Sequence, residues 1–276
     1  MKKTAKKIGY YLILFLTVAA IAFPVYWMAV SSLQTREAGF QYPPQLFPTE
    51  FDVSSYTDAF ASGDIFTWIR NSLIVALGVV VFNLINAVPA AYAIAKTRFK
   101  LSTILLFLVL ATQMVPPPLL VVPLFVIFRA AGLINNFISL ILADSILTLP
   151  LAAWVLVGFF ENLPDELSEA ARIDGCSRYG VFFRVALPLT KPAIVTVSLF
   201  TFYDVWNEYL FGVTFMTNQS KWVGSVGLAS FVGQFVMRWK PMMTHSLLFS
   251  IIPLVIYFFA RNQILKGAAQ GFMSSK

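Results

Sequence analysis

Long apolar stretches, separated by short polar segments, follow one another along the whole chain. Each stretch has about 20 or more residues, the length that an α-helix needs to cross a hydrocarbon core of about 30 Å. The expected spans lie at residues 8–33, 68–95, 101–128, 137–160, 187–215 and 243–260. The pattern therefore predicts an all-α integral membrane protein with six transmembrane helices and with both termini on the same side.

The composition supports a membrane location. Of the 276 residues, 58% are hydrophobic and 12% are charged, whereas a soluble domain usually carries about 25% charged residues. Because charged side chains cover a water-facing surface, so few of them are poorly suited to a soluble fold. The net charge of +7 would suggest nucleic-acid binding in a soluble protein, but here the basic residues lie between apolar runs. We therefore expect membrane lipid, and no nucleic acid, as a partner.

The distribution of Lys and Arg predicts the orientation. With a cytoplasmic N-terminus, 14 of the 20 basic residues fall on the inner side, namely Lys2, Lys3, Lys6, Lys7, Lys96, Arg98, Lys100, Arg172, Arg178, Arg184, Lys191, Arg261, Lys266 and Lys276. The other 6 fall on the outer side, namely Arg36, Arg70, Arg129, Lys221, Arg238 and Lys240. This excess has the direction of the positive-inside rule. We therefore expect a multi-pass protein with both termini in the cytoplasm.

The polar segments divide one transmembrane domain, residues 1–276, into loops. The outer loops are expected at 34–66 and 217–241, the inner loop at 161–188 and an inner tail at 261–276. The first outer loop is expected to lead into a short amphipathic helix around residues 55–61. The Lys-rich start with an apolar stretch at 8–30 also suits a signal peptide. That stretch exceeds the roughly 7–15 residues of a signal core, so a first span is expected instead.

The inner loop contains clear helix signals. Residues 162–163 can precede a first turn, Pro164 suits the first helical position, and acidic residues follow it. Arg172 comes late, and Gly175 stands where a left-handed residue ends a helix. This predicts a helix of about ten residues, followed by a second short helix from Ser177 towards Pro188. One face is expected to carry Leu163, Leu167, Ala170 and Ala171, and another Glu166, Glu169 and Arg172. Such helices suit either a lipid surface or a protein partner.

Several polar side chains fall inside the expected spans. A charged group at the middle of a membrane costs roughly 2.5–3.5 kcal/mol on insertion scales, so each one needs a reason. The candidates for a transport path are Gln113, Asp144, Tyr203, Asp204, Asn207 and Glu208. Spacing on a continuous helix would place Asp204 and Glu208 on one face. These residues either line the path or pair with one another or with a partner chain.

The third span contains consecutive prolines at 116–118 and another at 123. Proline removes an amide donor, which a membrane helix tolerates only where protein or a water-filled cavity covers the gap. A broken helix is therefore expected, either as a plain kink or as part of a transport pathway.

The sequence gives no sign of enzyme chemistry. It contains no Gly-x-x-x-x-Gly-Lys-Ser/Thr phosphate loop, so this chain is not expected to bind ATP. Cys176 and His245 are the single residues of their kinds, and neither has metal-ligand spacing around it. We therefore expect no catalytic residue, no metal and no cofactor in this chain. An autonomous ion-coupled carrier stays possible, with Asp144, Asp204 and Glu208 as its ion or proton site.

The inner loop resembles a known motif. Glu169-Ala-Ala171, three residues, Gly175, nine residues and Val185-Ala-Leu-Pro188 are similar to the EAA loop of permease subunits in binding-protein-dependent ABC importers. Val185 in place of Ile is the only departure. Further stretches resemble the maltose-type, MalG-like subunits of carbohydrate importers, and they extend over nearly the whole chain. They are residues 42–49, Asn71-Ser72, 90–95, 114–117 and 206–211.

The resemblance implies the type I ABC importer permease fold, in a bacterial inner membrane. It implies a second permease subunit, two ATPase subunits that bind ATP and Mg, and an extracytoplasmic solute-binding protein. The loop would be a coupling helix whose ATPase contacts are Glu166, Glu169, Ala170, Ala171, Asp174, Gly175 and Arg178. The cargo would be a sugar or oligosaccharide, although glycerol-phosphate permeases share the pattern. In maltose-type importers the sugar site lies mainly in the other permease subunit. The tail at 261–271 is similar to the family's, whereas residues 272–276 depart from it.

Overall fold

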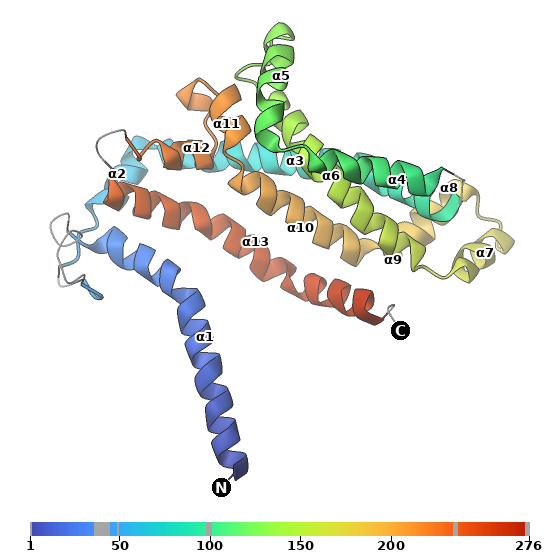
Figure 1. The fold of residues 1–276 in the computed structure, drawn as a ribbon, viewed down its shortest axis with the longest axis horizontal. Coiled ribbons are helices and arrows are strands. Elements are labelled where there is room, and N and C mark those ends of the chain that lie inside the picture. Colours follow the sequence, from blue (N-terminus) through green and yellow to red (C-terminus); the bar gives the residue numbers. More distant parts are fainter. Residues whose placement is uncertain (1, 36–44, 49, 98–100, 234–236, 274–276) are drawn as a thin grey trace. The chain divides into compact units, whose positions relative to one another are not determined.

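The computed structural model describes residues 2–35, 45–48, 50–97, 101–233 and 237–273 (Figure 1). Side chains are described for these residues except 2–5, 8, 103 and 262–273. Residues 42–44 and 49 of the first outer loop therefore lie outside the described part, as do Arg36, Arg98, Lys100 and Lys276. Over the described ranges the regular structure is helical, apart from an isolated bridge between Val232 and Met237.

Four helices in the described residues are long and apolar enough to cross a membrane. They are α1 (Lys2–Leu33), α3 (Asp64–Thr97), α6 (Phe137–Glu161) and α13 (Trp239–Met273). Two bent pairs also qualify, Ile104–Met114 with Pro117–Ala130 at 94° and Arg178–Leu189 with Lys191–Asn207 at 69°. Counting each pair as one span gives six. The predicted all-α membrane architecture is confirmed.

Two of the expected spans differ from straight helices. The third is divided into α4 (Ser102–Ala111), the 3-10 turn η2 (Thr112–Met114) and α5 (Pro117–Ala130), so the break expected from the prolines is present. The fifth, expected over 187–215, consists of α9 (Leu187–Leu189), α10 (Lys191–Asn207) and α11 (Leu210–Phe215). It is interrupted because Glu208 has extended backbone angles. The sixth is longer than expected, since α13 continues through Met273 into the tail.

The chain forms two compact units. The first comprises Met1–Phe66 with Gly227–Ile252, and the second comprises Thr67–Val226 with Pro253–Lys276. Within the first unit, α1 ends at Leu33, and the short helix α2 (Ser54–Ser62) is followed by Gly63, whose φ is +73°. This helix confirms the amphipathic segment expected around residues 55–61. The Ser32 hydroxyl lies 2.6 Å from the Tyr56 hydroxyl, which joins α1 to α2.

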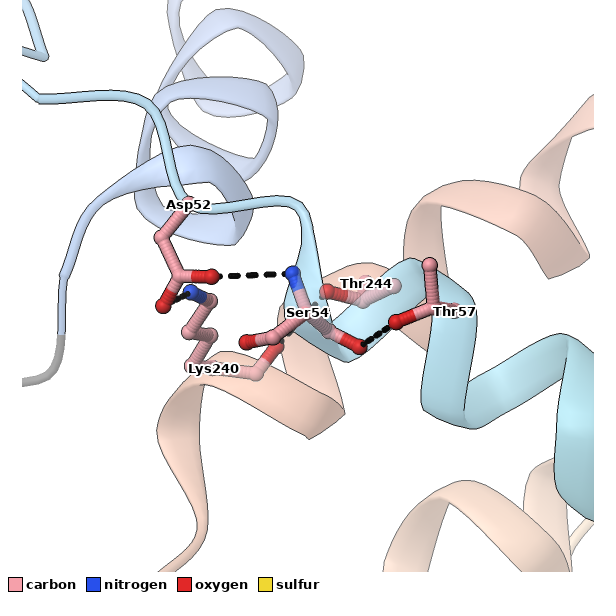
Figure 2. A network of polar contacts seen from close by, with 5 residues as sticks. All are labelled: Asp52, Ser54, Thr57, Lys240 and Thr244. Carbon is pink, nitrogen blue, oxygen red and sulfur yellow. Dashed lines mark hydrogen bonds and ion pairs between the residues drawn. The ribbon is translucent and has the colours of Figure 1, made fainter.

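A polar network holds the start of α2 against the start of α13 (Figure 2). Lys240 forms an ion pair with Asp52, and the Ser54 amide donates to Asp52 Oδ1 at 2.9 Å. The Thr244 hydroxyl donates to the Lys240 carbonyl at 3.0 Å, and the Thr57 hydroxyl donates to the Ser54 carbonyl at 2.7 Å. The hydrogen bonds from Lys240 and Ser54 hold the pKa of the Asp52 carboxyl below its usual value of 3.8.

A Lys240→Met variant lacks the ammonium group that pairs with Asp52, so the start of α2 should no longer be held against the start of α13. Hydrogen exchange of the amides at 54–62 should become faster, whereas Lys221→Met, which alters a cation over the Phe137 ring, should leave it unchanged. Because the folded pKa of Asp52 is lowered, the link is fully present above pH 3.8 and is lost as the pH falls from that value through the lower folded pKa. Wild-type exchange should then approach that of the variant. Identical exchange in both proteins at neutral pH would contradict the prediction.

In the second unit, α6 is the central helix, and it contacts α4, α5, α10 and α11. Its buried face is rich in small residues such as Ala143, Ala152 and Ala153, which let membrane helices approach closely. A core cluster joins α3, α6, the π-helical turn η3 (Phe182–Ala186) and α10, and it consists of Ala87, Val88, Ala91, Ala152, Ala153, Leu156, Val157, Phe160, Ala186, Ala193 and Val197. This core packs beside the loop at 161–188 and along α6, and these are the two regions that contain candidate site residues.

Polar side chains near the N-terminal end of α3 bind the segment at 220–224. Asn71 Nδ2 donates to the carbonyls of Ser220 at 3.0 Å and Trp222 at 2.9 Å. The Ser72 hydroxyl accepts from the Gly224 amide at 2.8 Å. These bonds anchor η4 (Gln219–Lys221) and the start of α12 (Gly224–Ala229). The Asn71-Ser72 pair noted in the sequence therefore has a structural role within this unit.

Candidate functional site

The loop at 161–188 folds as predicted into two short helices. The first, α7 (Asp165–Ile173), has Asp165 and Glu166 in its first turn and Arg172 in its last. This places acidic residues at the positive end of the helix dipole and a basic residue at the negative end. Pro164 has φ −56° and ψ 132°, so it precedes the helix instead of occupying its first position.

The end of α7 is a Schellman turn. The Cys176 amide donates to the Ala171 carbonyl at 2.9 Å, and the Gly175 amide donates to the Arg172 carbonyl at 3.0 Å. Gly175 has φ +85°, the left-handed conformation that this turn requires. The expectation for Gly175 is therefore confirmed. The turn directs the chain into the second helix at a fixed angle.

The second helical segment continues directly towards α10. Its parts are α8 (Arg178–Val181), the π-helical turn η3 (Phe182–Ala186) and α9. The Ser177 hydroxyl accepts from the Gly180 amide at 3.1 Å and so caps α8. The Phe182 ring lies 4.9 Å from that of Tyr92, which in turn lies 5.4 Å from that of Phe160. This aromatic contact packs the segment on the core of the second unit.

Lys96, at the end of α3, fixes the start of α7. Its Nζ donates to the Leu163 carbonyl at 2.6 Å and to Asp165 Oδ1 at 2.7 Å, and its side chain is 13% exposed. This contact was not predicted from the sequence, in which Lys96 indicated only the orientation of the chain. A lysine at the end of a span, with an acidic residue at the start of the next loop helix, was the signal available.

The predicted partner contacts of the loop are almost all on its surface. Glu166, Glu169, Ala170, Asp174, Gly175 and Arg178 are exposed, whereas Ala171 is buried. The expectation that Ala170 and Ala171 share one face is wrong, because Ala171 faces inward where α7 packs on α8 and η3. Apolar side chains are also exposed here, namely Leu167, Ile173, Tyr179 and Phe183, and of these Leu167 was expected on an apolar face. Ile173 is 86% exposed and Tyr179 is 79% exposed.

A cavity of about 580 Å³ lies in the second unit, between the break of the third span, α6 and the end of α10. Four of the predicted path residues line it together: Gln113, Asp144, Asp204 and Glu208. Most of the other lining is apolar, with Leu147, Leu151 and Trp154 along α6. The proline break at 115–116 places Gln113 and Pro117 at the cavity wall.

Glu208 occupies the helix break instead of a helical face. Its Oε1 accepts from the Phe211 amide at 2.8 Å, and its Oε2 accepts from the Gly212 amide at 3.0 Å. Its backbone carbonyl accepts from the Ser225 hydroxyl. The expected face of Asp204 and Glu208 on one continuous helix is therefore wrong. The two carboxyl groups still meet at the cavity because the chain turns between α10 and α11.

Asp144 is held rigidly in α6 and is 3% exposed. Its carbonyl accepts from the Thr148 hydroxyl at 2.8 Å, and Asn83 Nδ2 donates to the same hydroxyl at 2.7 Å. Its Oδ1 has no hydrogen-bond partner among the described residues. Tyr203 and Asn207 lie outside the cavity lining: the Tyr203 hydroxyl donates to the Pro253 carbonyl at 2.7 Å, and Asn207 Nδ2 donates to the Tyr203 carbonyl at 2.8 Å. Their place on a transport path stays a prediction.

Comparison with known proteins gives a consistent family assignment. The family described as "Binding-protein-dependent transport system inner membrane component" matches residues 87–266. The sulfoquinovosyl glycerol transport system permease protein SmoH of Agrobacterium fabrum is 33% identical, over 90% of this chain and 87% of the relative. The diacetylchitobiose uptake system permease protein DasC of Streptomyces coelicolor is 31% identical, over 91% of each. The inner membrane ABC transporter permease protein YcjP of Escherichia coli is 31% identical, over 98% of this chain and 97% of the relative.

Two solved structures share the fold. One is a chain of a bacterial ABC transporter involved in the import of the acidic polysaccharide alginate, with a TM-score of 0.79, 22% identity, and 96% of this chain and 98% of that chain covered. The other is a chain of the MetNI methionine ABC transporter in an inward-facing conformation, with a TM-score of 0.61, 18% identity, and 75% and 97% covered.

Proposed function

The chain belongs to the family of binding-protein-dependent transport system inner membrane components, and we propose that it forms, with a second permease subunit, the path for a sugar or oligosaccharide. It is a permease subunit of an ABC transporter and a multi-pass membrane protein. The cargo is proposed from the relatives, because SmoH is named for a sulfonated sugar linked to glycerol and DasC for a disaccharide. A solute-binding protein on the outer side would deliver it. The ion-coupled carrier is not favoured, since the family works with binding proteins.

The loop at 161–188 is the observation that carries the proposal. Its helices expose acidic side chains beside apolar ones, while Lys96 and the Schellman turn hold their geometry. Exposed apolar side chains such as Ile173 and Tyr179 indicate an interaction surface, and the exposed charges on the same helices favour a protein over a lipid surface. Because the positive-inside rule predicts a cytoplasmic position for this loop, we assign it to the contact with one of the two ATPase subunits. Those subunits would bind ATP and Mg.

The docking assignment is tested by co-purification of the ATPase subunits with this chain. A Glu166→Lys/Glu169→Lys variant reverses two exposed charges without touching the buried Ala171. Retention of the ATPase subunits should fall at least roughly tenfold, which corresponds to about 1.4 kcal/mol. Asp58→Lys, a charge reversal at an exposed position of α2, should retain them fully. Equal retention by the loop variant and the wild type would count against the assignment.

A further inference from the structure

Carboxyl groups dominate the polar lining of the cavity beside the break of the third span. Asp144, Asp204 and Glu208 contribute carboxyl groups, and none of the described lining residues is Lys, Arg or His. The amide nitrogen of Gln113 is already committed, since its Nε2 donates to the Leu147 carbonyl at 2.6 Å. The Gln113 amide oxygen adds one more acceptor to the lining. A ligand that satisfies this lining must bring donors of its own.

Asp144 gives the sharpest evidence for such a ligand. It is 3% exposed, lines the cavity, and its Oδ1 has no hydrogen-bond partner among the described residues. A buried carboxyl oxygen without a partner is costly and calls for an explanation, such as a bound group. The hydroxyl of Thr148 does not satisfy it, because that hydroxyl donates to the Asp144 carbonyl. Hydrogen bonding along α6 therefore fixes the backbone at Asp144 and leaves Oδ1 available.

Glu208 provides a negative charge where the cavity meets the start of α11. Both of its carboxyl oxygens accept from backbone amides at the start of α11. Backbone N–H groups at the start of a helix favour a negative group. An anionic ligand entering here would meet a fixed negative charge with no basic residue in the described lining to balance it. A neutral or cationic ligand would meet the carboxyl acceptors without this repulsion.

The rest of the cavity suits a small polar organic molecule. Its volume of about 580 Å³ lies within the roughly 300–1,000 Å³ of small-molecule sites. Leu147, Leu151 and Trp154 supply apolar walls, and a few polar groups on such walls are the usual composition of these sites. Across the described chain, no three His, Cys, Asp or Glu side chains are grouped so as to hold a metal ion. The acceptors are thus arranged for a larger ligand with donor groups.

We propose that this cavity binds a part of the transported sugar that donates hydrogen bonds and carries no negative charge, through its hydroxyl groups or a protonated amine. The inference rests on the proposed transport function and narrows its substrate class. It predicts that uronic and sulfonated sugars are rejected. In this respect the chain would differ from its relative SmoH, which is named for a sulfonated sugar, and from the importer described for the acidic polysaccharide alginate. Asp144 supplies the buried acceptor, and Glu208 and Asp204 supply the charge that excludes anions.

The test uses the assembled importer without its binding protein, so that ligand binding reports the membrane cavity. Three disaccharides of matched size serve as probes in calorimetric titrations: cellobiose, the disaccharide of glucosamine, and digalacturonate. At least one of the first two should bind at least roughly tenfold more tightly than digalacturonate, since tenfold is about 1.4 kcal/mol. Equal binding of all three, or binding of none, would overturn the inference.

Substitutions at Asp144 show whether the ligand group that donates the hydrogen bond is an amine or a hydroxyl, and a control variant shows whether any loss is specific to the cavity. If the donor is an amine, Asp144→Asn should weaken glucosamine-disaccharide binding at least tenfold and leave cellobiose within about threefold. If it is a hydroxyl, Asp144→Asn should have little effect and Asp144→Leu should weaken both ligands. Asp204→Asn, at an exposed position, should reduce the discrimination against digalacturonate, and Asp58→Asn is the control. Unchanged discrimination in all three cavity variants would overturn the inference. Retention of the ATPase subunits, measured on the same preparations, tests the transport function separately.

Discussion

Replacing Phe160 with alanine should lower the free energy of unfolding of the chain by about 3 kcal/mol, the lower end of the range for buried Phe-to-Ala changes. Phe160 is fully buried near the end of α6, and its ring packs edge-on against Tyr92 at 5.4 Å. Truncation leaves a cavity between α3 and α6 that the surrounding helices fill only in part. The lower end of the range applies because packing, more than transfer from water, stabilises membrane helix contacts.

The measurement is unfolding of the purified chain in detergent, with Phe107→Ala as the matched control. Phe107 is 71% exposed on α4, so the same truncation there removes few contacts. Phe160 is followed by Glu161, the last residue of α6, so loss of its packing should also loosen the loop at 161–188. Equal stabilities of the two variants would show that the core cluster does not hold this end of the unit.

Local patterns in the sequence were sufficient for much of the fold. Apolar runs predicted the long helices because the length of a span follows from the thickness of the membrane. Gly175 predicted the end of α7 because a left-handed residue at that place favours glycine. The prolines predicted the break after Met114 because proline lacks an amide donor. Each of these features is determined by residues that lie close together in the sequence, so it can be predicted without knowledge of tertiary contacts.

Features that depend on distant partners were not predicted. Asn71 donates hydrogen bonds to the carbonyls of Ser220 and Trp222, and Lys96 forms an ion pair with Asp165. The local sequence around Asn71 or Lys96 does not indicate which distant residue it contacts. The break at Glu208 was missed for a related reason. A carboxylate inside an apolar run looks the same whether it occupies a helical face or accepts amides of the next helix. Periodicity on an assumed continuous helix therefore gave the wrong geometry for Glu208, although the cavity that it lines with Asp144 was anticipated in part.

The burial of neighbouring alanines in α7 illustrates the same limit. Ala170 and Ala171 are equally apolar, and their spacing alone allowed one shared face. The packing of α7 on α8 and η3 separates them, leaving Ala170 exposed and Ala171 9% exposed. The position of α8 depends on the left-handed Gly175 and on the Ser177 cap. A prediction of this face therefore needs the geometry of the whole turn.

Replacing Gly175 with valine should reduce binding-protein-stimulated ATP hydrolysis by the assembled importer at least roughly tenfold, on the scale of 1.4 kcal/mol per factor of ten. Gly175 has φ +85°, and no atom lies within 4 Å of an added Cβ. The effect is therefore backbone strain and not collision, at about 1–2 kcal/mol for an L-residue in this region. Strain at this turn weakens the two hydrogen bonds that the Gly175 and Cys176 amides donate at the end of α7, and so it displaces Glu169 relative to Arg178.

Two further variants separate this mechanism from general instability. Gly132→Val introduces the same kind of strain in the turn between α5 and α6, where φ is +68° and an added Cβ is also unobstructed. It should lower the free energy of unfolding by a comparable amount but leave ATP hydrolysis stimulated by the binding protein, because that turn lies outside the loop at 161–188. Gly175→Asn should retain most of the activity, since asparagine tolerates the left-handed region. If Gly132→Val uncouples hydrolysis as strongly as Gly175→Val, the geometry of the loop is not what transmits the ATPase motion.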